Sequence, residues 1–139
     1  MSTDRDAGGG SGIAVGGRRV RRSVMVADDS VDVRRAMVAL IGNDAAFSVV
    51  ADVGDAPDAV AAAARHQPDI AVLDVHMPGG GGAEAASRIR DAAPSTRIVA
   101  HSANDDAFSR RAMLDAGAVA YAVKGRDALL DVLRSLAVE

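Results

Sequence analysis

Five short apolar segments alternate with five helix-like segments along this chain, and that alternation constrains its fold more than any other feature. The expected strands are 23–27, 47–53, 69–74, 96–101 and 118–123, and the expected helices are 30–41, 56–66, 83–92, 105–116 and 126–137. Strands that alternate with helices usually form parallel pairs, because each helix crosses over a face of the sheet. The sequence therefore predicts an α/β fold, a doubly wound five-stranded parallel sheet with helices on both faces.

Four of these strands run into polar side chains at their C-terminal ends. The side chains are Asp28 with Asp29 after the first strand, Asp74 in the third, Ser102 after the fourth and Lys124 after the fifth. The carboxyl ends of parallel strands meet along one edge of the sheet, which is where open α/β sheets bind their ligands. We therefore expect these groups to lie close together.

Such a group of side chains suits phosphoryl chemistry. Neighbouring carboxylates repel one another unless a cation lies between them. Carboxylate oxygens without a set of His or Cys ligands favour Mg²⁺, which commonly binds a phosphate oxygen as well. The ammonium of Lys124 and the hydroxyl of Ser102 would add contacts to a phosphoryl group, and Asp74 could be the nucleophile. Taken one at a time, the same residues also fit ordinary roles, such as a capping Asp-Asp pair or a solvated lysine.

Composition narrows the classes of protein to consider. The chain has 139 residues, of which 49% are hydrophobic, and this suits one domain with one core. It has no cysteine, so disulfides and thiolate metal sites are excluded. The part after residue 22 holds 11 basic and 17 acidic residues, so we expect no direct nucleic-acid binding. No apolar run approaches the roughly 20 residues of a membrane span, and we expect a cytoplasmic protein without membrane contact.

Residues 1–22 are predicted to form a flexible tail rich in glycine and arginine. Gly8, Gly9, Gly10, Gly12, Gly16 and Gly17 disfavour regular structure. A phosphate-binding loop is the alternative, but no Gly-Lys-Ser/Thr sequence follows these glycines. The folded domain is therefore expected to span 23–139.

Four short segments follow one another along the chain: Val-Ala-Asp-Asp at 26–29, Leu-Asp-Val-His-Met-Pro-Gly at 73–79, Ala-His-Ser-Ala at 100–103 and Gly-Ala-Val-Ala-Tyr-Ala-Val-Lys at 117–124. In these segments and their order, residues 23–137 resemble the receiver domain of bacterial two-component response regulators. The resemblance implies a flavodoxin-like (CheY-like) sheet with strand order 2-1-3-4-5. Met-Pro-Gly and the Tyr-x-x-Lys-Gly ending are similar to NarL/LuxR-type receivers, which are joined to a DNA-binding helix-turn-helix.

The resemblance implies a role for each polar group at the strand ends. Asp74 would accept a phosphoryl group from a sensor histidine kinase, and Lys124 would pair with that group. Mg²⁺ would be held by Asp28, Asp29, Asp74 and the backbone carbonyl of His76. The domain would act in signalling and not as an enzyme, apart from its own phosphotransfer and dephosphorylation.

Four residues would control the signal. Ser102 and Tyr121 would form a switch, in which the hydroxyl moves toward the phosphoryl group and the ring turns inward. His76 and Asn104 each lie two residues beyond a site residue, and they would set how fast water attacks the acyl phosphate.

Three further features qualify the resemblance. The loop 79–82 is all glycine, so we expect it to adopt positive φ and to be adaptable. Gly125 stands where many receivers have proline. His101, directly before Ser102, is expected to be structural.

The expected output is a change in protein contacts. A homodimer would form through the helix 105–116, the strand 118–123 and the helix 126–137, whose charges are of mixed sign. We expect either a stand-alone receiver or the receiver part of a longer regulator, since residues 1–139 contain no recognisable output domain.

Two alternatives use the same residues differently. A pseudo-receiver would have this fold and bind proteins without ever being phosphorylated, and loss of Mg²⁺ binding would identify it. A phosphohydrolase of the haloacid dehalogenase type needs a second aspartate two residues after the nucleophile, where this chain has His76. A dinucleotide-binding domain is excluded, because no Gly-x-Gly-x-x-Gly follows the first strand.

Overall fold

The elements of the fold follow the predicted alternation of strands and helices. The computed structural model describes residues 13–15 and 18–137. Its strands are β1 Ile13–Val15, β2 Arg18–Val20, β3 Arg22–Ala27, β4 Phe47–Val53, β5 Ile70–Asp74, β6 Arg97–Ser102 and β7 Ala118–Val123. Its helices are α1 Val31–Gly42, α2 Ala56–His66, α3 Gly81–Ala92, α4 Ala107–Asp115 and α5 Leu129–Ala137. None of these described helices is long and apolar enough to cross a lipid bilayer.

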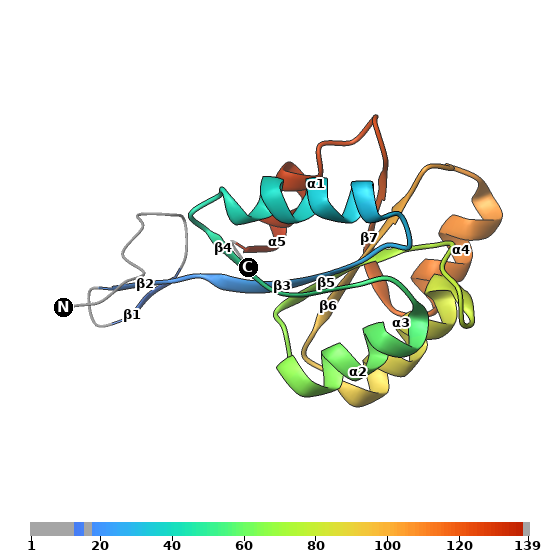
Figure 1. Ribbon diagram of the computed structural model, residues 1–139, viewed down its shortest axis with the longest axis horizontal. Coiled ribbons are helices and arrows are strands. Elements are labelled where there is room, and N and C mark those ends of the chain that lie inside the picture. Colours follow the sequence, from blue (N-terminus) through green and yellow to red (C-terminus); the bar gives the residue numbers. More distant parts are fainter. Residues whose placement is uncertain (1–12, 16–17, 138–139) are drawn as a thin grey trace.

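The strands from β3 to β7 form one parallel sheet in the order β4-β3-β5-β6-β7. Counted from β3, this is the order 2-1-3-4-5, so the predicted fold is confirmed. Figure 1 shows α1 and α5 on one face of the sheet and α2 and α3 on the other. The order of the strands reverses between β3 and β5, and open α/β sheets bind ligands beside such a reversal.

An apolar cluster covers each face of the sheet, because successive side chains of a strand point to opposite sides. Met25 of β3 packs in the cluster that contains Ile89 of α3, whereas its neighbour Val24 packs with Met37 of α1 and Leu133 of α5. Helices thus pack on both faces of the sheet, and this packing fixes the positions of the strand ends that carry the polar residues.

The segment before the sheet differs from the prediction. Residues 1–22 are predicted as a flexible tail, yet β1 and β2 pair as antiparallel strands, with Ile13 opposite Val20. The sequence contains the reason, since β-branched residues on both sides of Gly16-Gly17 are a typical hairpin signal. β3 also starts one residue before the predicted boundary. Residues 1–12 lie outside the described residues.

Two helices begin two or three residues later than predicted, because polar side chains form hydrogen bonds with the backbone before them. α4 begins two residues late, since the carboxylate of Asp106 accepts the backbone N–H of Ser109 at 3.0 Å and caps the helix. α5 begins three residues late, and in the preceding turn Asp127 accepts the backbone N–H of Val123 at 2.8 Å. Both polar contacts lie next to the C-terminal edge of the sheet, so they shape the loops around the site.

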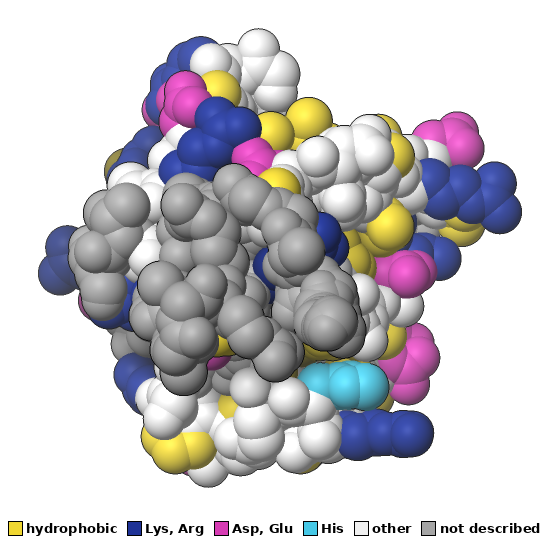
Figure 2. Space-filling model, turned by 90° about the vertical axis from the view of Figure 1, so that its left-hand side faces the viewer, with side chains coloured by type: hydrophobic (Ala, Val, Ile, Leu, Met, Phe, Trp, Pro, Cys, Tyr) yellow, Lys and Arg dark blue, Asp and Glu magenta, His cyan; other side chains and the backbone are white. Residues whose placement is uncertain are grey.

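The opposite end of the sheet carries charges of both signs. Figure 2 views the molecule from that end, and basic and acidic side chains are intermixed on the part of the surface that the structure describes. Arg134 of α5, for example, pairs with Asp44 at 2.6 Å in the turn before β4. This mixture differs from the C-terminal edge of the sheet, where carboxylates gather.

The loop between β5 and α3 needs glycine for two physical reasons. Gly79, Gly80 and Gly81 have φ values of +84°, +123° and +83°, which favour glycine, as the sequence predicts. A Cβ added at Gly82 would overlap the carbonyl oxygen of Asp74 and lie 2.8 Å from Cα of Val75. The start of α3 therefore packs directly against the end of β5, while the adaptability of the loop stays a prediction.

Replacing Gly82 with alanine is expected to lower the free energy of unfolding by about 1–3 kcal/mol, because the added methyl group forces the backbone of β5 to shift. Urea unfolding of variant and wild type would measure the difference. Gly42→Ala is a matched control, since a Cβ at this last residue of α1 meets nothing within 4 Å. The control should be neutral or stabilising by up to about 1 kcal/mol. Equal stability of Gly82→Ala and wild type would contradict the tight packing.

Candidate functional site

Three carboxylates lie together at the C-terminal edge of the sheet. Asp28 follows β3 and Asp74 ends β5, and their exposed fractions are only 0% and 6%. Asp29 is exposed beside them. One carboxylate oxygen from each residue lies within 4.8 Å of the other two. The three residues meet because β3 and β5 are adjacent parallel strands that end at the same edge.

Lys124 brings an ammonium group to these carboxylates from the end of β7. Its Nζ donates a hydrogen bond to Oδ2 of Asp28 at 2.7 Å and lies 3.5 Å from Oδ1 of Asp74. Backbone N–H groups also contribute: Ser30 donates to Asp28 at 2.9 Å, and His76 donates to Asp74 at 3.3 Å. One ammonium against three carboxylates leaves the cluster with a net negative charge.

A second set of contacts joins Ser102 to Tyr121. Ser102 ends β6 and is fully buried, and its Oγ accepts the backbone N–H of Asn104 at 3.1 Å. The hydroxyl of Tyr121, a buried residue of β7, donates to the backbone carbonyl of the same Asn104 at 2.8 Å. The backbone of Asn104 therefore connects two side chains that the sequence predicts only as a functional pair.

The loops after β5 and β6 contain the same kind of side-chain to backbone hydrogen bond. In each loop, the side chain at the strand end accepts the N–H of the residue two positions later: His76 donates to Asp74, and Asn104 donates to Ser102. The side chains of His76 and Asn104 are themselves exposed. Both residues are thus fixed through their backbones, and their side chains lie at the surface next to the site.

A model of the response regulator receiver domain matches residues 24–134, a span that includes every group described above. This chain belongs to that family. Receiver domains are the signalling modules of two-component systems, and the predicted family and its CheY-like fold are confirmed.

Relatives of this receiver include several transcriptional regulators. It is 36% identical over 107 residues to the transcriptional regulatory protein PdtaR of Mycobacterium tuberculosis, covering 76% of this chain and 50% of PdtaR. It is 38% identical over 105 residues to the DNA-binding transcriptional activator DevR/DosR of the same species, covering 73% of this chain and 46% of DevR/DosR. The first of the curated relatives, a protein-glutamate methylesterase/protein-glutamine glutaminase of Nitrosospira multiformis, is matched over only 28% of its length. This chain therefore spans about half or less of these relatives.

Solved structures lead to the same family. A two-component response regulator of the LuxR family from Aurantimonas sp. SI85-9A1 superposes with a TM-score of 0.80 and 29% identity, over 86% of both chains. The receiver domain of Thermotoga maritima CheB superposes with a TM-score of 0.74 and 26% identity, over 84% of this chain and 94% of that one.

The acidic cluster of the receiver fits a hard divalent cation. Three carboxylates can each direct an oxygen to one ion, and the cluster contains no imidazole or thiolate ligand. This donor set is the kind that Mg²⁺ prefers, and Mg²⁺ binding at an acidic pocket is general in receiver domains. Because Lys124 balances only one of the three carboxylates, a divalent cation would also relieve the remaining repulsion.

Asp74 has a raised pKa in the folded receiver. Burial is the main cause, and the negative charge of Asp28 adds to it. The ammonium of Lys124 and the N–H of His76 act in the opposite direction without cancelling the rise. The folded receiver thus holds a proton on Asp74 more tightly than the unfolded chain does, so ionising this carboxyl destabilises the fold.

In a chelating buffer at neutral pH, Asp74→Asn is expected to unfold at a higher temperature than wild type. The neutral amide removes the cost of an ionised, buried carboxyl. Stability from a group with a raised pKa is complete below its unfolded value and is lost as the pH rises through the folded value. The advantage of the variant should therefore shrink as the pH falls toward the ordinary value of 3.8, where wild type is also protonated. Thermal melts at several pH values would measure it, and a variant less stable than wild type at pH 7 would contradict the argument.

Sequence reasoning missed an ion-pair network beside Tyr121. The guanidinium of Arg110 stacks on the Tyr121 ring, 4.6 Å from its centroid, and also pairs with Asp105. Arg126 pairs with the same Asp105 at 2.8 Å. Hydrogen bonds from Arg110 and Arg126 hold the pKa of Asp105 below its ordinary value. The sequence shows these residues only as surface charges of mixed sign, since no spacing rule pairs positions 21 residues apart.

Proposed function

We propose that this receiver accepts a phosphoryl group on Asp74 from the phosphohistidine of a sensor histidine kinase. The observation that carries the proposal is the Asp74 carboxylate at the end of β5, which shares the ammonium of Lys124 with Asp28. An oxygen of Asp74 would attack phosphorus, and a P–O bond would form as the P–N bond to the histidine breaks. The histidine nitrogen keeps that electron pair, and the ring takes up a proton. The product is an acyl phosphate.

The other groups of the site would stabilise the transferred phosphoryl group. Asp28, Asp29 and Asp74, with the backbone carbonyl of His76, would hold Mg²⁺, which neutralises negative charge on phosphoryl oxygens. Lys124 would pair with one of those oxygens, since its ammonium already lies 3.5 Å from the Asp74 carboxylate. The exposed side chains of His76 and Asn104 would then set how readily water reaches the acyl phosphate.

Ser102 and Tyr121 would convert phosphorylation into a change of shape. Ser102 Oγ is the hydroxyl on β6, the strand next to β5, and its present partner is the backbone N–H of Asn104. If this hydroxyl moves toward a phosphoryl group, the loop that contains Asn104 loses that hydrogen bond. The hydroxyl of Tyr121 donates a hydrogen bond to the backbone carbonyl of Asn104, so a movement of this loop would also move Tyr121. A ligand-biased equilibrium between two such arrangements is how receivers could change their contacts.

Ser102→Ala is expected to accept a phosphoryl group but to lose most of the response at Tyr121, because the methyl group cannot bond to the phosphoryl oxygen. Tyr121 is the single tyrosine of a chain without tryptophan, so intrinsic tyrosine fluorescence reports on it alone. Wild type should change its fluorescence on addition of beryllofluoride and Mg²⁺, a phosphoryl mimic, and the variant should change far less. Ser135→Ala, at an exposed site on α5, serves as the control. A full response in Ser102→Ala would speak against the switch.

The output surface would be formed by α4, β7 and α5. Phe108 and Leu114 on α4 and Val119 on β7 are large apolar side chains with exposed fractions of 83%, 43% and 53%. An output partner that covers these side chains together would remove a contiguous apolar surface from water, which is the kind of surface that protein contacts use. We propose a homodimer or an output partner at this surface. Since DevR/DosR is a DNA-binding activator, this receiver would also suit the regulatory part of a DNA-binding regulator.

Intact mass after incubation with acetyl phosphate tests the central step. We expect one added phosphoryl group with Mg²⁺ and none in a chelating buffer. A pseudo-receiver would gain no mass and would not bind beryllofluoride with Mg²⁺. Beryllofluoride binding without added mass would instead indicate an acyl phosphate that hydrolyses within the time of the measurement.

A further inference from the structure

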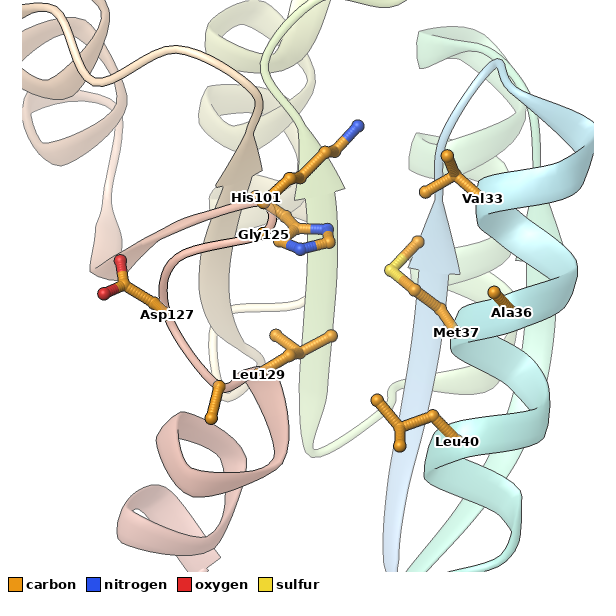
Figure 3. Close-up of a pocket in the computed structure, with 10 residues that line it drawn as sticks. Val33, Ala36, Met37, Leu40, His101, Gly125, Asp127 and Leu129 are labelled. Atoms are coloured by element: carbon orange, nitrogen blue, oxygen red, sulfur yellow. The ribbon is translucent and has the colours of Figure 1, made fainter.

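A largely apolar pocket of about 400 Å³ is lined in part by Lys124, whose ammonium also pairs with the acidic cluster. Met37 and Leu40 of α1 form one wall, and Leu129, together with the loop before α5, forms the other. Figure 3 shows the imidazole of His101 between these two walls. Pockets that bind small molecules usually have volumes of about 300–1,000 Å³ and few polar groups, so this pocket is large enough for a ligand.

His101 is the unusual residue of this pocket. It is 93% buried at the end of β6, and its Nδ1 has no hydrogen-bond partner among the described residues. Burial and the nearby charge of Lys124 lower the pKa of His101 to about 4, so the ring is neutral at physiological pH. Buried polar groups without a partner are rare and costly in folded proteins. The sequence predicts a structural role for His101, but no hydrogen bond at Nδ1 among the described residues accounts for a polar residue here.

Charged groups at the edge of the pocket are already paired. The ammonium of Lys124 is bonded to Asp28 at 2.7 Å. The carboxylate of Asp127 accepts the backbone N–H of Val123 at 2.8 Å and pairs with Arg126 at 3.4 Å. Neither charge is left to balance an ionic ligand, so the pocket favours an uncharged one.

We infer that this pocket binds an uncharged small molecule of one or two aromatic rings, whose single hydrogen-bonding group pairs with the imidazole of His101. Size supports this class, since a cavity of about 150 Å³ already holds benzene. The open walls support it too: Leu40 is 46% exposed, and its side chain would be covered by the ligand. The inference does not depend on phosphorylation of Asp74.

Titration of the full chain with indole, followed by NMR, tests the inference. Indole has two fused rings and one N–H donor, and N-methylindole has the same shape without the donor. We expect indole to shift the backbone signals of Leu40, Gly125 and Ala128 together with the ring signals of His101. N-methylindole should bind about three- to tenfold more weakly, which is the range for one lost hydrogen bond.

Two variants make the titration decisive. In His101→Leu, indole should bind as weakly as N-methylindole, while the affinity for N-methylindole should change little. Ala36→Trp would place a ring in the pocket from an exposed position of α1 and should reduce indole binding at least tenfold. Ala39→Trp is its control, because Ala39 is also exposed on α1 but does not line the pocket. Absence of shifts up to the solubility of indole, or equal binding of the two indoles, would overturn the inference.

Discussion

Asp74→Asn is expected to abolish phosphoryl uptake from acetyl phosphate and Mg²⁺, with the fold intact. The amide nitrogen cannot take the place of the attacking carboxylate oxygen, so the loss should be complete and not partial. Shape and contacts change little, because the side-chain carbonyl of asparagine can still accept the N–H of His76, now at 3.3 Å from Oδ1. Intact mass of variant and wild type, measured side by side, would show the difference.

A control variant distinguishes loss of the phosphoryl acceptor from the effect of removing any one carboxylate from the protein. Asp91→Asn removes an exposed carboxylate from α3, outside the acidic cluster, and should take up one phosphoryl group like wild type. Added mass in Asp74→Asn would place the acceptor elsewhere. Asp28 would then be the first candidate, since its carboxylate is bonded to the same Lys124.

The fold class could be predicted from the sequence because the lengths, the apolar patterns and the order of its segments all favour a parallel α/β sheet. Apolar strands of five to seven residues alternate with helical segments, and this pattern permits few parallel topologies. The strand order itself came from the resemblance to receivers, since alternation alone does not decide which strands are neighbours. The prediction of a flexible tail does not include the hairpin β1–β2, because it treats glycines as a sign of flexibility, although Gly16-Gly17 between β-branched residues favours a turn.

The site was predictable where it depends on strand ends, and less so where it depends on loops. Asp28, Asp74 and Lys124 meet because parallel strands end together, and the structure places them within ion-pair distance. The link between Ser102 and Tyr121 depends on the backbone of Asn104, and no side-chain pattern reveals a backbone contact. The missing partner at Nδ1 of His101 is equally hidden in the sequence, because the elements packed around a buried histidine determine its contacts.

Lys124→Met is expected to slow phosphoryl uptake by about 10²–10³-fold, the range for losing one charged contact to a developing anion. The same substitution should strengthen Mg²⁺ binding. At present the ammonium of Lys124 competes for Oδ2 of Asp28, at 2.7 Å. Without it, two buried carboxylates and Asp29 would repel one another unrelieved, so Mg²⁺ should bind more tightly than in wild type.

Two measurements would test whether Lys124→Met slows phosphoryl uptake and strengthens Mg²⁺ binding. The rate of mass gain at saturating Mg²⁺ gives the loss of phosphoryl uptake, and thermal melts with and without Mg²⁺ give the cation effect. The variant should be less stable than wild type in a chelating buffer, because Asp28 is buried without its partner, and Mg²⁺ should raise its melting temperature by more. Arg126→Met is the matched control, since its guanidinium pairs with Asp105 and Asp127, outside the acidic cluster. If Lys124→Met both slows phosphoryl uptake and weakens Mg²⁺ binding, the result would contradict a role of Lys124 in pairing with the phosphoryl group. Loss of both properties together would instead indicate that the variant disrupts the structure of the whole site.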